Sequence, residues 1–85
     1  MRKDSGLTET LTLPASIRTV AEVGDIVESV RKEQGLTQMD ASGLSGLGIR
    51  FMVDLEKGKE TIQMQKVLDV LTQLGLEIII RKKGL

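Results

Sequence analysis

Only hydroxyl, carboxylate and basic side chains are available for chemistry, because the sequence contains no cysteine and no histidine. The usual zinc ligands, cysteine nucleophiles and Cys–His or Ser–His pairs are therefore absent. Nothing in the chain supplies a base, a nucleophile or a metal site of a familiar kind, so we expect no enzyme and no cofactor. The chain can still bind a partner, and the positions of its charged and apolar side chains indicate where the binding surface lies.

Length and composition favour one small domain. At 85 residues a single hydrophobic core is only marginally sufficient, so assembly with a second copy would help. Twelve Lys and Arg residues balance twelve Asp and Glu residues, so the net charge neither indicates nor excludes nucleic acid as a partner. No apolar run approaches the roughly 20 residues of a membrane span, and the N-terminus lacks the apolar stretch of a signal peptide. We therefore expect a cytoplasmic protein that has no membrane partner.

A first helix is predicted over residues 20–34. Thr19 and Glu22 have the spacing of a capping box, and Gly35 provides a stop. Between these signals, apolar residues recur at three- and four-residue steps and form one face. The predicted face consists of Val20, Val23, Ile26, Val27 and Val30.

The next segment is unusually rich in glycine, with five glycines between residues 35 and 59. Thr37 can cap a short helix over residues 38–44. Gly46 then permits a tight turn, because glycine readily adopts positive φ. The segment therefore predicts a short helix followed by a sharp change of direction.

A third helix is expected at residues 48–57, and Gly58 ends it. The spacing of Met52 and Leu55 predicts that both are buried, with Phe51 beside them. Two short helices joined by a glycine-containing turn form a helix-turn-helix, in which the second helix can enter the major groove of DNA.

Two further elements are predicted at the C-terminal end. Residues 63–74 have the pattern of a helix that closes the core, with Met64, Val67, Leu68, Leu71 and Leu74 on its buried face. After Gly75 the residues favour a strand, which would contain Leu76, Ile78, Ile79 and Ile80. An unpaired apolar strand is a liability, so we expect it to pair with a second subunit or with the N-terminal segment. A disordered tail and an end that touches a membrane remain as alternatives.

These motifs resemble the Cro/CI, or XRE, family of helix-turn-helix repressors over about residues 19–75. The resemblance rests on "GLTQ" and, eight residues later, on "LGIRFMVDLEKGK". The version "RFMVDLEKGKETIQMQKVLDVLTQLGLEI" is most similar to HipB-like antitoxins, which are transcription factors found beside HipA-type kinase toxins. The resemblance implies a mainly α, lambda-repressor-like helix-turn-helix domain of four to five helices over residues 17–75. It also implies a C-terminal β-strand and basic tail over residues 76–85, in which the strand pairs across a homodimer. Residues 1–16 would be a polar arm, flexible or a short strand.

The resemblance further implies which residues contact double-stranded DNA. Family positions that face the major groove match Gly48, Ile49, Arg50 and Asp54, and positions that contact the DNA backbone match Gln38, Lys57 and Lys59. Arg50 would reach guanine O6 and N7 or a phosphate, and Ile49 would rest on a thymine methyl group. Asp54 would accept from cytosine N4 or hold Arg50 in place.

Arg31 and Glu56 match a pair that forms a salt bridge between the first and third helices of XRE domains. A partly buried pair of this kind contributes more reliably to register than to stability. The alternative for these two residues is a pair of solvated charges.

The function implied by the resemblance is that of a sequence-specific repressor. It would bind a palindromic operator as a dimer, autoregulate its operon and act as the antitoxin of a HipA-type kinase toxin. Two alternatives stay open: a protein-interaction module that neutralises a partner without reading DNA, and a plain phage-type repressor that has no toxin.

Overall fold

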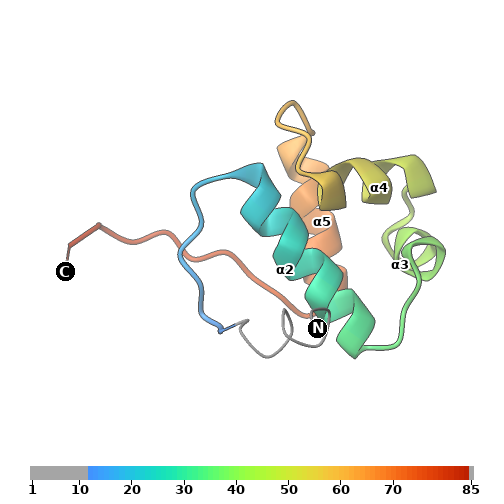
Figure 1. Ribbon diagram of the computed structural model, residues 1–85, viewed down its shortest axis with the longest axis horizontal. Helices are drawn as coiled ribbons and strands as arrows, with labels where there is room; N and C mark the ends of the chain where they lie inside the picture. Colours follow the sequence, from blue (N-terminus) through green and yellow to red (C-terminus); the bar gives the residue numbers. More distant parts are fainter. Residues whose placement is uncertain (1–11, 85) are drawn as a thin grey trace, which may run out of the picture.

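The computed structural model describes residues 12–84 and contains four helices in that part of the chain (Figure 1). They are α2 (Val20–Glu33), α3 (Gln38–Ser45), α4 (Ile49–Lys57) and α5 (Met64–Gln73). Each boundary lies close to its predicted position, so the helical fold expected from the sequence is confirmed. Most of the arm predicted over residues 1–16 lies outside the described residues. Within residues 12–84, no helix is long and apolar enough to cross a bilayer.

Side-chain caps fix the starts of α2 and α3. The Thr19 hydroxyl accepts from the Glu22 N–H at 3.1 Å, and the Glu22 carboxylate accepts from the Thr19 N–H at 3.1 Å. Thr37 and Asp40 form the same reciprocal pair at the start of α3, with both distances 3.0 Å. Backbone N–H groups of Arg18 and Thr19 hold the pKa of Glu22 below its usual value. Both helices therefore begin where the local sequence satisfies their free amides.

The turn between α3 and α4 depends on a glycine. Gly46 has φ 71° and ψ 21°, in the left-handed region, and its N–H donates to the Gly43 carbonyl at 3.2 Å. The Leu47 N–H donates to the Ser42 carbonyl at 2.9 Å, which closes the turn. Because side-chain-bearing residues rarely adopt this φ, Gly46 sets the direction in which α4 leaves α3.

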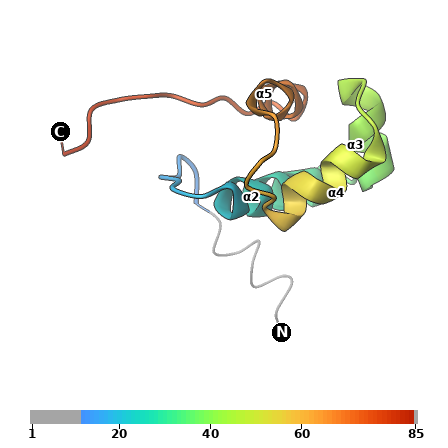
Figure 2. The ribbon, with the colours of Figure 1, turned by 90° about the horizontal axis from the view of Figure 1, so that it is seen from above.

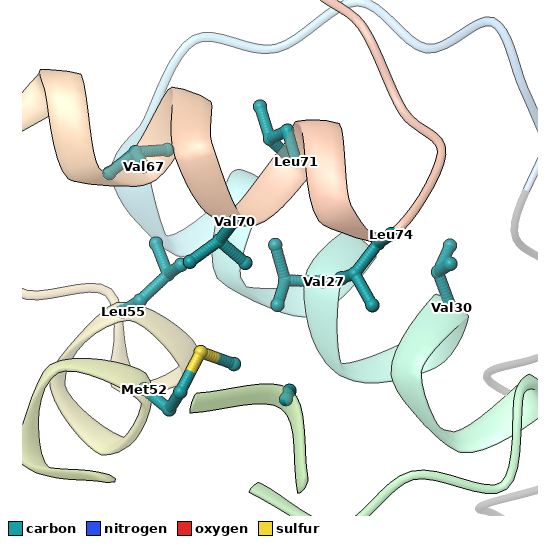
Figure 3. Close-up of a cluster of buried hydrophobic side chains, with 9 residues drawn as sticks. Val27, Val30, Met52, Leu55, Val67, Val70, Leu71 and Leu74 are labelled. Atoms are coloured by element: carbon teal, nitrogen blue, oxygen red, sulfur yellow. The ribbon is translucent and has the colours of Figure 1, made fainter. Parts of the chain in front are cut away.

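The core lies where the four helices meet, with α5 covering the layer formed by α2 and α4 (Figure 2). Met52 and Leu55 from α4 are fully buried and lie near Val27 of α2 and Val70 of α5 (Figure 3). The other buried apolar residues are Val30, Ala41, Val67, Leu71 and Leu74. The predicted apolar face of α2 is confirmed, since its remaining members Val20, Val23 and Ile26 pack against this cluster.

The buried face of α5 differs from the predicted one. Met64 was expected in the core but is 57% exposed, whereas Val70, which was not in the predicted set, is fully buried. The buried face of α5 is therefore rotated toward Val70 and away from Met64, while the predicted Leu68 is partly buried and packs against the core. Met64 is also the first residue of α5, so it lies at the N-terminal end of the helix.

The C-terminal strand predicted over residues 76–80 is not observed. No strand occurs in the described chain, because a strand needs a paired neighbour and no other described segment provides one. Leu76 and Ile78 pack against the core, while Ile79 and Ile80 are 72% and 91% exposed. Beyond α5 the chain runs away from the helices as an extended segment (Figure 1).

A buried ion pair joins α2 to α4. Arg31 donates from Nε to Glu56 Oε2 at 2.7 Å and from Nη2 to Oε1 at 2.9 Å. Its third nitrogen donates to the Leu36 carbonyl at 2.7 Å, and Gln38 Nε2 donates to Glu56 Oε1 at 3.0 Å. The Arg31 and Glu56 side chains are only 8% and 5% exposed. The hydrogen bond to Glu56 raises the pKa of Arg31 above its usual value. One network thus connects α2, the following loop, α3 and α4.

Two glycines allow α2 to approach the C-terminal end of α4. A Cβ at Gly24 would overlap the carbonyl oxygen of Leu55 and lie 3.0 Å from that of Glu56. A Cβ at Gly58 would lie 2.7 Å from the Cα of Ala21. The two backbones therefore touch at a place where no side chain fits.

We predict that Gly24→Ala destabilises the protein by about 1–3 kcal/mol, because the overlap with backbone exceeds the gain in helix propensity. Gly43→Ala is the matched control, since Gly43 is also helical and a Cβ there meets nothing within 4 Å. That control should be stabilised by about 1 kcal/mol. Urea denaturation followed by circular dichroism measures both variants. Equal stability of the two variants would contradict the close contact.

We also predict that Arg31→Met lowers the free energy of unfolding by about 3–5 kcal/mol, because it leaves the Glu56 carboxylate buried without its partner. Adding Glu56→Leu should recover much of the loss. Lys32→Met removes an ion pair to Glu28 that is 60% and 33% exposed, and should cost less than about 1 kcal/mol. Denaturation at one fixed protein concentration tests the series. A loss in Arg31→Met no larger than that in Lys32→Met would refute the structural role of the pair.

Candidate nucleic-acid interface

Five residues lie on the side of α4 that is turned away from the core. Successive residues of a helix are turned by about 100°, and Met52 and Leu55 define the buried side. The opposite side is then formed by Ile49, Arg50, Val53, Asp54 and Lys57. We call these five residues the outer face of α4. Arg50 and Lys57 lie nearest its centre, and its other members lie to either side.

Charges on the outer face are partly paired. Arg50 Nε lies 3.3 Å from Asp54 Oδ1, and Lys59 Nζ lies 3.6 Å from Asp54 Oδ2. Asp54 is the least exposed of the three side chains, at 18%, whereas Arg50 is 84% exposed and Lys59 55%. One carboxylate therefore orients two cations and neutralises one of their two charges. Lys57 is exposed on the same face.

The N-terminus of α4 carries no side-chain cap. Gly48 is the N-cap residue, outside the helix itself, with extended backbone at φ −74° and ψ 157°. A Cβ at this position would meet nothing within 4 Å, so the domain packing does not demand glycine here. The prediction that the absent side chain leaves room for a phosphate stays a prediction.

The remaining residues predicted to contact DNA lie in different environments. Ile49 is 43% exposed at the start of α4. Gln38 is partly buried, and its amide nitrogen is engaged by Glu56, so this side chain belongs to the Arg31–Glu56 network. Glu56 is therefore hydrogen-bonded by both Arg31 and Gln38. The structure thus gathers the α4 residues on one surface and links Gln38 to the Arg31–Glu56 ion pair.

The candidate residues from the sequence did not include Val53, although it lies on the outer face. It is partly buried, yet it is not among the side chains that pack against the described core. The four-residue step from Ile49 to Val53 and on to Lys57 is the sequence signal that locates it. Among the described residues, no group of three or more acidic side chains is placed to hold a metal ion.

Comparison with known proteins supports this interpretation of the fold. The chain is 52% identical over 68 residues to the uncharacterized HTH-type transcriptional regulator y4mF of Sinorhizobium fredii (strain NBRC 101917 / NGR234). The aligned region covers 80% of this chain and 90% of that protein. No family model matches the chain. This chain combines that level of identity with two short helices, α3 and α4, which are joined by the turn at Gly46. The chain belongs to the helix-turn-helix transcriptional regulators.

Proposed function

We propose that the protein is a sequence-specific repressor that inserts α4 into the major groove of a palindromic operator. The outer face of α4 carries this proposal, because an 84% exposed arginine, a lysine and two apolar side chains project from a helix that packs on its other side. Arginine pairs with guanine O6 and N7 or with phosphate, and apolar side chains contact thymine. In this role Gly48, Ile49, Arg50 and Asp54 face the bases, and Lys57 and Lys59 contact the DNA backbone. Gln38 would approach the backbone from the start of α3.

The charge of the chain makes a dimer important to this function. Twelve basic and twelve acidic residues leave no net charge, so one domain gains little from phosphate attraction alone. Two copies related by a two-fold axis present two recognition helices about 34 Å apart, one turn of DNA. Both half-sites of a palindrome then contribute to the binding free energy of one dimer.

The dimer would form through the C-terminal segment. Leu76 and Ile78 anchor the segment on the core, and the exposed Ile79 and Ile80 continue beyond it. An extended apolar segment with an unpaired backbone is completed when an identical segment pairs with it. In this arrangement residues 76–80 form a two-stranded sheet between subunits, and residues 81–85 form a basic tail.

The proposal includes an antitoxin role, in which the same dimer holds a HipA-type kinase toxin inactive in the cytoplasm and autoregulates their operon. The resemblance to HipB-like proteins supports this part. A protein-interaction module that does not read DNA is a second candidate, favoured by Leu44 and Ile49, which are 55% and 43% exposed around the turn. Binding to operator DNA distinguishes the two functions.

We predict that Arg50→Ala weakens operator binding by about 1–3 kcal/mol, because a guanidinium contact to a base or phosphate is lost. The operator is first obtained from the region upstream of the gene, and affinity is measured by fluorescence anisotropy at several salt concentrations. Lys32→Ala is the control, since Lys32 lies on α2 and pairs with Glu28. Unchanged affinity of Arg50→Ala for every upstream palindrome would remove α4 as the recognition helix.

We also predict that the double variant Ile79→Asp, Ile80→Asp is monomeric, because carboxylates across a paired strand repel. Both side chains are largely exposed in one chain, so the helical domain should keep its stability. Sedimentation or light scattering reports the mass, and Met64→Asp serves as the control at an exposed apolar residue outside the segment. A dimer that survives the double substitution would exclude pairing through residues 76–80.

A further inference from the structure

The C-terminal segment beyond α5 alternates between two environments. Leu76 and Ile78 pack against the core, whereas Glu77 is exposed and Ile79 is 72% exposed. This alternation is that of an extended strand, in which successive side chains point to opposite sides. Ile80 belongs to the same series as Ile78 but is 91% exposed, because the segment leaves the helices as it runs toward the C-terminus (Figure 2). The segment therefore has two distinct sides within a single chain.

Opposite charges flank the three isoleucines of this segment. Glu77 precedes residues 78–80 and Arg81 follows them, and both side chains are exposed. If two copies paired in parallel and in register, each charge would lie beside its own counterpart, and like charges opposite each other destabilise a pair of strands. Antiparallel pairing instead brings the acidic end of one copy to the basic end of the other. The charge order thus favours an antiparallel pair of identical segments.

Two-fold symmetry limits the register of such a pair. Directly opposed residues point to the same side of a sheet, because side chains alternate along each strand. A two-fold axis perpendicular to the sheet also keeps each residue on the same side in both copies. The numbers of two opposed residues therefore differ by an even number, so the axis passes through a residue and not between two.

The side chains distinguish the possible axes. With the axis at Ile79, Glu77 lies opposite Arg81. Ile78 then lies opposite Ile80, so each isoleucine meets an isoleucine. An axis at Ile78 would set Ile79 against Glu77, and an axis at Ile80 would set Ile79 against Arg81. Cross-strand pairs of apolar residues and of opposite charges are the favourable ones, so the axis at Ile79 fits this sequence best.

We propose that the chain selects a second copy of itself through an antiparallel strand pair centred on Ile79, in which Glu77 of each copy forms an ion pair with Arg81 of the other. This inference rests on the proposed function, because it concerns the dimer that would bind the palindrome. The two ion pairs determine the direction and register of pairing, since every shifted arrangement leaves a charge against an apolar or like-charged residue. The exposed Ile80 is covered by Ile78 of the second copy.

Charge exchange tests the ion pairs on the full 85-residue chain without DNA. Glu77→Arg sets arginine against arginine at two places in the dimer, so we expect the dimer Kd to rise about tenfold or more. Combining it with Arg81→Glu restores opposite charges and should return Kd to within about threefold of the unmodified protein. Glu60→Arg is the matched control, since it makes the same charge change at an exposed residue between α4 and α5 and should leave Kd unchanged. Sedimentation measures Kd, and circular dichroism verifies that each variant keeps its helices.

The register can be tested with a single introduced thiol, because the chain contains no cysteine. Ile79→Cys should form a disulfide-linked dimer under mild oxidation, since residues opposed at the axis have Cα atoms about 5 Å apart. Ile78→Cys is the matched control. Its two copies would lie diagonally about 7–8 Å apart, beyond the reach of a disulfide. Non-reducing gel electrophoresis reports the linked species.

The outcomes separate this inference from the proposed function. Linkage through Ile78→Cys in place of Ile79→Cys would overturn the register, and a charge exchange that does not restore the dimer would overturn the ion pairs. In both cases the dimeric repressor stands. If the unmodified chain stays monomeric both alone and on operator DNA, the dimeric repressor and this inference fall together.

Discussion

The ion pair between Arg31 and Glu56 is the constraint on which the position of α4 depends. Both side chains are nearly inaccessible to water, so each charge is tolerated only while its partner is in place. Arg31 also binds the Leu36 carbonyl, and Glu56 also accepts from Gln38. The network therefore fixes α4 relative to α2 and to the start of α3. A rotation of α4 would break these hydrogen bonds and leave two buried charges without their partners.

Close backbone contact at the other end of the α2–α4 interface completes this constraint. Gly24 faces the last carbonyls of α4, and Gly58 faces Ala21, with no room for a Cβ at either glycine. Contact between backbones allows little adjustment, because backbone atoms cannot change rotamer as side chains can. The ion pair and the two glycines together hold the C-terminal end of α4 against α2, so the outer face of α4 stays turned away from the core. A recognition helix needs this rigidity, since base contacts depend on position.

The sequence predicted those features that local chemistry determines. Thr19 and Glu22 marked the start of α2, and glycine marked the turn after α3, because caps and positive φ are properties of a few neighbouring residues. Val70 was missed, because an apolar stripe alone does not show which of two overlapping faces meets a partner. Pairing of residues 76–80 cannot be observed in one chain, since the proposed partner is another molecule. The engagement of Gln38 by Glu56 depends on a tertiary contact that no spacing rule contains.

The balance of charge explains why the outer face of α4 would combine apolar and cationic side chains. Affinity from phosphate contacts is independent of sequence, so a strongly basic domain binds everywhere on DNA. Here Asp54 neutralises one of the two cations beside it, which lowers this general attraction and orients Arg50 at the same time. Base contacts must then supply a larger share of the binding free energy. Since an apolar side chain adds no charge, the exposed Ile49 beside Arg50 does not increase the general attraction of this face for phosphate.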